Sequence, residues 1–117
     1  MISPTDLQNI IRNGLLSFPV TPFDAQDNFA KAPFQAHLDW LSQYKVAGLI
    51  VAGGTGEMFS LAPSEIVEVV KATREVVGDA PVLAGCGYGV RMACDLARDI
   101  EAAGGDVDVA AAMMQSQ

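Results

Sequence analysis

The segment GLIVAGGTGEMFSL, residues 48–61, joins an apolar run to a cluster of three glycines. Its first half is uncharged and aliphatic, as expected for a buried strand. Gly53, Gly54 and Gly56 follow directly; glycines allow positive φ angles and let a ligand approach bare backbone amides. In α/β proteins, ligands bind at the carboxyl ends of parallel strands, which is where this turn falls. The segment therefore predicts a strand followed by a ligand-binding turn.

The ligand that suits this turn best is a single carboxylate. Backbone amides in a turn, together with the Thr55 hydroxyl, make a site for an anionic oxygen. The acidic Glu57 nearby disfavours a polyphosphate. The segment is not a P-loop, because no Gly-Lys-Ser/Thr follows, and its glycines do not have the spacing Gly-x-Gly-x-x-Gly. The alternative interpretation is a tight strand-to-helix turn that binds nothing.

Predicted strands and amphipathic helices alternate on both sides of this segment. A short leading helix is predicted in SPTDLQNIIRN, with Ser3 or Thr5 as its N-cap. Three strand–helix units follow, with strands at 14–20, 48–54 and 80–87 and helices at 31–48, 60–79 and 90–105. This alternation indicates right-handed βαβ units and a parallel sheet. The strands are apolar almost throughout, which is typical of a sheet covered on both faces or closed into a barrel.

The composition excludes several classes of protein. Fourteen acidic residues against seven basic ones give a net charge of −7, so the chain lacks the basic surface that nucleic-acid binding requires. No apolar run reaches the roughly 18 residues of a membrane-spanning helix, so no membrane partner is expected. The two cysteines, Cys86 and Cys94, fit neither a zinc pattern nor a disulfide framework, which favours a reducing, cytoplasmic location.

A few side chains have competing interpretations. Trp40 and Cys94 are predicted to pack in the core. Cys86 follows the third strand, where a pocket residue could stand, but we expect a small buried thiol. His37 could be a general base, but we expect a histidine on a helix surface or between helices. For Tyr88, in the loop after the third strand, a pocket and an interface are both open.

Three motifs occur in order, each at a predicted strand end: FPVTPFD at 18–24, GLIVAGGTGEMFSL at 48–61 and PVLAGCGYG at 81–89. Together they resemble the N-terminal part of the dihydrodipicolinate synthase / N-acetylneuraminate lyase family of class I aldolases. The resemblance implies a TIM barrel and covers about residues 5 to 106, the first three to four of eight βα units. The 117 residues are thus expected to form one partial (β/α)8-barrel domain. The last stretch, DVDVAAAMMQSQ, begins like a fourth strand and becomes polar, so truncation after about residue 106 is expected.

The resemblance also implies a substrate site. The family signature Gly-x-x-Gly-Glu corresponds here to residues 53–57. Thr55 and the amides of Gly54 and Thr55 would bind the C1 carboxylate of a 2-keto sugar acid. The substrate-binding set is Gly53, Gly54, Thr55 and Gly56; the pocket rim is Pro19, Thr21, Pro22 and Phe23; Glu57 would tie the loop to the following helix.

The form of the motifs implies a particular activity within the family. Synthases and lyases commonly carry a hydroxyl residue where this chain has Gly54. The combination of Gly54, Phe59 and Tyr88 is most similar to members that dehydrate and decarboxylate 5-dehydro-4-deoxyglucarate to 2,5-dioxopentanoate. Two alternatives stay open: another 2-keto-acid aldolase or lyase of the family, and a non-catalytic half-barrel fragment that associates with itself or another chain.

The catalytic groups that the resemblance implies are expected to be missing. The family's Schiff-base lysine lies on the sixth strand and its relay tyrosine on the fifth. Lys31, Lys45 and Lys71 fall in predicted helices or loops, so none is a candidate for the imine, and we predict no catalytic residue in this chain.

Cofactors and partners are few in this interpretation. No cofactor and no metal are expected, because Asp106 and Asp108 lack a third ligand and are predicted to be solvated. Full-length members of the family are expected to be homo-oligomers. Apolar strand faces left uncovered would make the isolated fragment self-associate.

Overall fold

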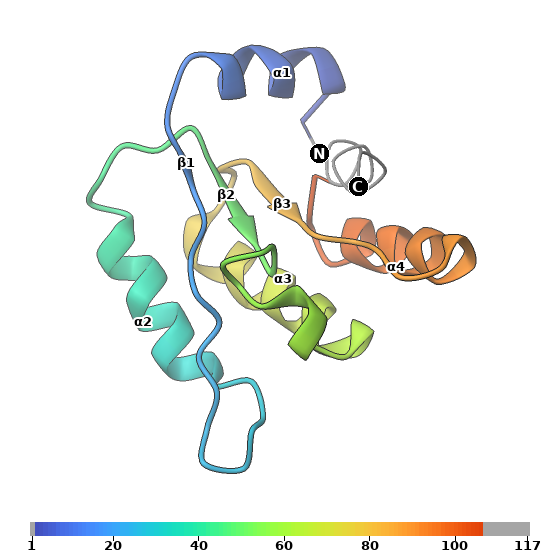
Figure 1. Cartoon of the computed structure of the whole chain (residues 1–117). Coiled ribbons are helices and arrows are strands. Elements are labelled where there is room, and N and C mark those ends of the chain that lie inside the picture. The colour runs from blue at the N-terminus through green and yellow to red at the C-terminus, as the bar shows by residue number, and fades with distance from the viewer. Residues whose placement is uncertain (1, 107–117) are drawn as a thin grey trace.

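A computed structural model describes residues 2–106. Its sheet has three parallel strands in the order β1–β2–β3: β1 is Leu16–Ser17, β2 is Gly48–Val51 and β3 is Val82–Ala84. β1 pairs with β2 through Leu16 and Gly48, and β2 pairs with β3 through Leu49 and Val82. The predicted parallel α/β arrangement is confirmed (Figure 1).

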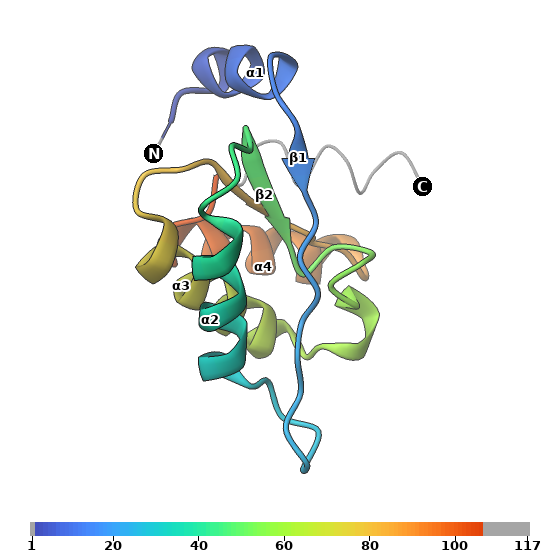
Figure 2. The ribbon, with the colours of Figure 1, turned by 90° about the vertical axis from the view of Figure 1, so that its left-hand side faces the viewer.

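Helices follow each strand and cover one face of the sheet. The described helices are α1 Pro4–Arg12, α2 Lys31–Leu41, α3 Pro63–Val77 and α4 Val90–Ala102, with a 3-10 helix, η1 Met58–Ser60, between β2 and α3. α3 contacts both α2 and α4. α1 lies across the end of the sheet where the strands begin (Figures 1 and 2). The opposite end, where the strands stop, carries the glycine-rich segment.

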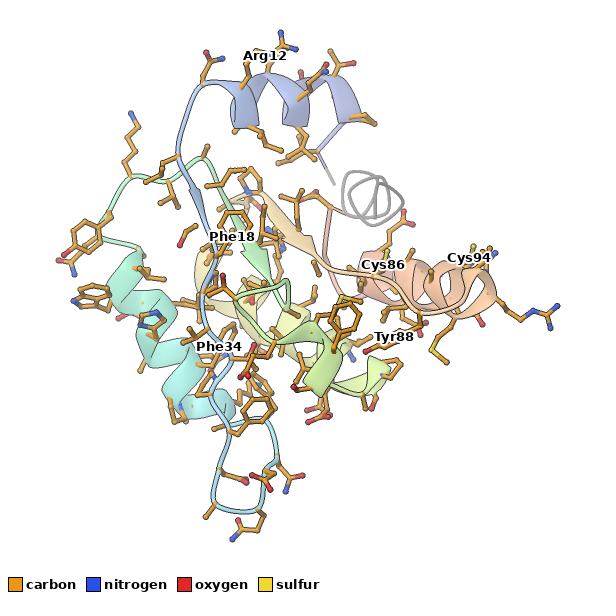
Figure 3. The ribbon with its side chains drawn as sticks, in the orientation of Figure 1. Arg12, Phe18, Phe34, Cys86, Tyr88 and Cys94 are labelled. Carbon is orange, nitrogen blue, oxygen red and sulfur yellow. The ribbon has the colours of Figure 1, made fainter. Side chains whose placement is uncertain are left out.

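The core lies between the sheet and the helices. Successive strand residues point to opposite faces, so Leu49, Val51, Val82 and Ala84 face the helices and are buried. The helices meet them with side chains at helical spacing: Phe34 and Leu38 on α2, Ile66, Val69 and Val70 on α3, and Leu96 and Ile100 on α4. Figure 3 shows Phe34 among these side chains, beside α2.

The helix starts follow local capping chemistry. Ser3, rather than Thr5, is the N-cap of α1, and its hydroxyl accepts a hydrogen bond from the amide of Asp6 at 3.2 Å. α3 begins with Pro63 in its first turn, and the Glu65 carboxylate accepts the amide of Ala62 at 3.0 Å. The start of α3 is therefore fixed by residues adjacent in sequence.

The first strand is much shorter than predicted. Pairing is limited to Leu16–Ser17 of the expected 14–20, and the flanking Leu15, Phe18 and Val20 are exposed rather than buried. Pro19 has no N–H for the ladder, and β1 is the edge strand of the described sheet, so one side of it has no neighbour within residues 2–106. The other two strands are also shorter than predicted, but every residue in them is buried.

The helix predicted at 31–48 ends early, at Leu41. The Ser42 hydroxyl donates to the carbonyl of Asp39 at 2.5 Å, and the side-chain amide of Gln43 donates to the carbonyl of Trp40 at 2.9 Å. Because these side chains satisfy the last carbonyls of the helix, they compete with its continuation.

Two predictions of core packing are wrong. Trp40 is 54% exposed and stacks on His37, with ring centroids 5.8 Å apart, because it lies on the outer face of α2. Cys94 is exposed on α4, whereas Cys86 is buried as predicted (Figure 3). None of the helices within residues 2–106 is both long and apolar enough to cross a membrane.

Asp106 is buried rather than solvated. Its carboxylate pairs with the Arg74 guanidinium at 3.3 Å and accepts the amide of Val82 at 3.0 Å, and its own amide donates to the Val82 carbonyl at 2.7 Å. The other Arg74 N–H groups donate to the carbonyls of Gly78, Ala80 and Gly104. All five donors of this guanidinium are used, so Arg74 joins the start of β3 to the end of α4. Asp108 and the predicted fourth strand lie outside the described residues.

Candidate substrate-binding loop at the strand ends

Residues 52–61, which we call the strand-end loop, turn back immediately after β2. The amide of Glu57 donates to the Gly54 carbonyl at 3.1 Å, and the amide of Met58 donates to the Gly53 carbonyl at 3.0 Å. None of Gly53, Gly54 and Gly56 uses the positive φ that glycine allows; the left-handed residues of the loop are Ala52 at φ 48° and Glu57 at φ 58°. A non-glycine residue in this region costs of order 1–3 kcal/mol, so the surrounding contacts must stabilise the turn.

The glycine that this turn requires is Gly56, and the requirement is one of space. A Cβ atom at Gly56 would lie 2.8 Å from the amide nitrogen of Ala52. Gly85, just after β3, also leaves space for this turn. A Cβ atom at Gly85 would lie 2.8 Å from the Ala52 carbonyl oxygen and 2.8 Å from the Met58 sulfur. Gly54, by contrast, has open space around its Cβ position.

Thr21 anchors the strand-end loop from the side of β1. Its hydroxyl donates to the Gly56 carbonyl at 2.7 Å, and the residue is only 4% exposed. The bond connects the segment after β1 to the turn after β2. Thr21, predicted as part of a pocket rim, is thus in direct contact with the glycine cluster.

Tyr88 reaches the same loop from the side of β3. Its hydroxyl lies 3.2 Å from the Met58 carbonyl oxygen and 3.0 Å from that of Leu61, and its ring meets Phe59 edge to face, with centroids 6.2 Å apart. Figure 3 places Tyr88 at the end of the sheet where the strands stop. Of the two interpretations left open for Tyr88, the structure favours a position beside the predicted site.

The amides of the loop are available to a ligand. Within residues 2–106, the N–H groups of Gly54, Thr55 and Gly56 donate to no protein acceptor; Gly54 and Thr55 are exposed, whereas Gly56 is buried. Two adjacent, exposed N–H donors and one hydroxyl in a fixed turn can bind an anionic oxygen. The loop therefore presents unpaired donors at Gly54 and Thr55, two of the residues predicted to bind a substrate.

The remaining predicted residues differ in their access to this loop. Pro19 is buried, and Pro22 and Phe23 are half-buried. Phe23 pairs with Phe29 in an isolated bridge that closes the loop before α2. Glu57 is exposed, and within the described residues its carboxylate makes no hydrogen bond or ion pair; its backbone instead forms the start of η1.

The described titratable groups at this end of the sheet are few. Burial raises the pKa of the Cys86 thiol, and the neighbouring Cys94 adds to the shift.

None of the lysines lies at a strand end, as predicted. Lys31 starts α2 and pairs with Glu75 at 3.1 Å, Lys45 lies between α2 and β2, and Lys71 is on α3. Within residues 2–106, no three His, Cys, Asp or Glu side chains are grouped so that they could hold a metal ion.

Another hollow lies at the other end of the sheet, where the strands begin. It has a volume of about 450 Å³ and is lined by residues that include Arg74, Glu101 and Asp106. Because every donor of Arg74 is already engaged by the protein, this hollow has no free cation to hold an anionic substrate. The strand-end loop is the better candidate site.

A parallel sheet with helices on one face and a glycine-rich loop at its strand ends defines the class of βα-barrel-type proteins, whose sites lie at that end. The model of the "Dihydrodipicolinate synthetase family" matches residues 12–112, and this chain belongs to that family. The family predicted from the three motifs is confirmed.

Two similar curated proteins carry the same name. A "Probable 5-dehydro-4-deoxyglucarate dehydratase" from Cereibacter sphaeroides is 51% identical over 105 residues, 90% of this chain and 35% of that protein. One from Bradyrhizobium diazoefficiens is 51% identical over 106 residues, 90% of this chain and 34% of that protein. The chain thus spans about a third of the length of the curated relatives that it matches.

Solved structures agree with this assignment. Dihydrodipicolinate synthase from Agrobacterium tumefaciens superposes with a TM-score of 0.80 at 30% identity, covering 87% of this chain and 35% of that one. N-acetylneuraminate lyase from Mycoplasma synoviae gives a TM-score of 0.74 at 26% identity, covering 85% of this chain and 35% of that one.

Proposed function

We propose that this chain carries the carboxylate-binding part of a 5-dehydro-4-deoxyglucarate dehydratase. The observation that supports this most is the strand-end loop, in which the exposed residues Gly54 and Thr55 have amides without an acceptor among the described residues, with the Thr55 hydroxyl on the same exposed segment. The proposal also draws on the relatives of that name, which are about half identical to this chain over 105 residues. Gly54 in the loop distinguishes the motif from the hydroxyl-bearing form that synthases and lyases commonly carry.

In this proposal the loop orients the substrate. Its amides and the Thr55 hydroxyl hold the C1 carboxylate of the 2-keto acid, so the adjacent C2 carbonyl is held in a fixed position. An amine that attacks C2 there forms an imine with loss of water. The protonated imine acidifies C3, a base removes the C3 proton, and the electron pair expels the hydroxyl on C4. Lys31, Lys45 and Lys71 lie away from the strand ends, so this chain is expected to bind the acid without forming the imine.

A titration with pyruvate, the smallest 2-keto acid, tests the binding. The amide resonances of Gly54, Thr55 and Gly56 should shift in a saturable way, while methyl pyruvate, which has no free carboxylate, should leave them in place. Thr55→Val should weaken binding about ten- to a hundredfold, as expected for one hydrogen bond to a charged group. Saturable shifts confined to the hollow around Arg74 would contradict the proposal.

Borohydride trapping tests the missing imine. Intact mass after incubation with pyruvate or 5-dehydro-4-deoxyglucarate and borohydride should equal that of the untreated chain. A single covalent adduct would mean that Lys31, Lys45 or Lys71 acts as the imine lysine, and the division between binding and chemistry proposed above would be wrong.

A second candidate is a binding site for another 2-keto acid of the same family. The superposition on N-acetylneuraminate lyase favours it, since that fold is shared. A comparison of pyruvate with 5-dehydro-4-deoxyglucarate in the same titration separates the two, because a dehydratase site should prefer the longer sugar acid. In either case we propose that the 117 residues act as one partial barrel domain, which should unfold in a single cooperative transition.

A further inference from the structure

Tyr88 has an unfavourable backbone conformation for a tyrosine. Its φ is 73°, in the left-handed region that glycine occupies without strain, and it stands between Gly87 and Gly89. A third glycine at this position would avoid that cost. The side chain must therefore make contacts that offset the strain of the backbone.

Those contacts are made to both ends of η1. The hydroxyl has one proton, and it lies within hydrogen-bond distance of the carbonyl of Met58, the first residue of η1, and of Leu61, the residue directly after it. The ring packs edge to face against Phe59 inside the same turn. Tyr88 thus holds the 3-10 turn from outside, from the neighbouring strand end.

The start of η1 is hydrogen-bonded to the glycines that precede it. Met58 donates its amide to the Gly53 carbonyl at 3.0 Å, and Glu57 donates to the Gly54 carbonyl at 3.1 Å. A displacement of η1 therefore moves the peptide groups that carry the unpaired amides. No other side chain among the described residues hydrogen-bonds to η1 or to Leu61.

We infer that Tyr88 is a positioning residue of the strand-end loop, and that its hydroxyl raises the affinity of the loop for a carboxylate. The second half of this inference rests on the proposed function; the first half does not. Tyr88 acts through η1 and needs no contact with the ligand.

The test compares Tyr88→Phe with Tyr44→Phe in the full chain. Tyr44 is an exposed tyrosine in the turn after α2, and within residues 2–106 its hydroxyl makes no hydrogen bond. Amide hydrogen exchange of Glu57, Met58 and Leu61 should become about tenfold faster in Tyr88→Phe and stay unchanged in Tyr44→Phe. Exchange within α3 should stay unchanged in both variants, which separates a local effect from general destabilisation.

A second variant separates the hydroxyl from the backbone. Tyr88→Gly suits a φ of 73° but lacks the hydroxyl, so its loop exchange should be at least as fast as that of Tyr88→Phe. Loop exchange at the wild-type rate in either variant would overturn the positioning role.

The affinity arm uses the pyruvate titration. Tyr88→Phe should weaken pyruvate binding three- to tenfold and Tyr44→Phe should leave it unchanged. Faster loop exchange with unaltered pyruvate affinity would overturn the link to the ligand. If the wild-type loop does not bind pyruvate, the proposed function fails, and the exchange measurement still decides whether Tyr88 positions the loop.

Discussion

Thr21→Val removes the bond between the first two strand ends with little change in shape. The Thr21 hydroxyl donates to the Gly56 carbonyl at 2.7 Å in a buried position, and within residues 2–106 that carbonyl has no other partner. Leaving a buried acceptor unsatisfied costs about 1–3 kcal/mol. The methyl group that replaces the hydroxyl returns up to about 0.8 kcal/mol by burial. We therefore expect the free energy of unfolding to fall by about 1–2 kcal/mol.

Urea unfolding followed by circular dichroism measures this loss. The midpoint should fall with no change in the slope of the transition, because the variant alters stability and not the surface exposed on unfolding. In a thermal melt the same loss corresponds to a decrease of roughly 4–8 °C for each kcal/mol in a domain of about this size. Thr5→Val, at an exposed position on α1, is the matched control and should change stability by less than about 0.5 kcal/mol. If Thr21→Val is as stable as Thr5→Val, the anchoring bond contributes nothing and the reasoning is refuted.

Three further predictions concern packing, charge and reactivity. Gly56→Ala should lower the free energy of unfolding by about 1–3 kcal/mol, because its Cβ would lie 2.8 Å from the Ala52 backbone. Gly54→Ala has open space around its Cβ and should change the free energy of unfolding by less than about 0.5 kcal/mol. Urea midpoints of the two variants measure the difference. Asp106→Asn should cost about 3 kcal/mol, since it leaves the guanidinium of a partly buried ion pair without its carboxylate, and a urea midpoint equal to that of the wild type would contradict this. Because burial raises the pKa of Cys86, less of its thiol is ionised at any given pH, so iodoacetamide should label Cys94 first and Cys86 only at higher pH; peptide mapping that finds equal rates at pH 8 would count against this.

The sequence predicts most reliably where several local signals agree. For α3, the proline of the first turn, the apolar spacing from Ile66 to Thr73 and the glycine after Val77 all indicate the same helix, which the structure contains. The apolar run of β2 and the glycines after it likewise placed the candidate loop at a strand end. These features depend on neighbours in sequence, so the pattern is sufficient to find them.

The features that the sequence did not reveal depend on distant residues. Trp40 was assigned to the core because one face of its helix is apolar, but Trp40 lies on the outer face of α2, which no described element covers. Asp106 was expected in solvent because nothing nearby in sequence suggests a partner, and Arg74 lies 32 residues away. The residues with left-handed backbone are Ala52 and Glu57, and not the glycines. Gly56 is needed for a different reason, because a Cβ atom there would meet the backbone of Ala52. A hydroxyl residue just after a strand, as at Thr21 and Tyr88, is the signal that could have identified the two anchors.

The two anchors of the strand-end loop also give its formation an order in time. Thr21 precedes its acceptor by 35 residues, and Tyr88 follows Leu61 by 27 residues. During synthesis from the amino terminus, the loop therefore leaves the ribosome with one anchor already available and the other not yet translated. The amides of Gly54 and Thr55 reach their final arrangement only after β3 and the turn that follows it have emerged. A nascent chain stalled before Tyr88 should hold the sheet edge of β1 and β2 but a loose loop, so the ability to bind a carboxylate would be gained late in translation.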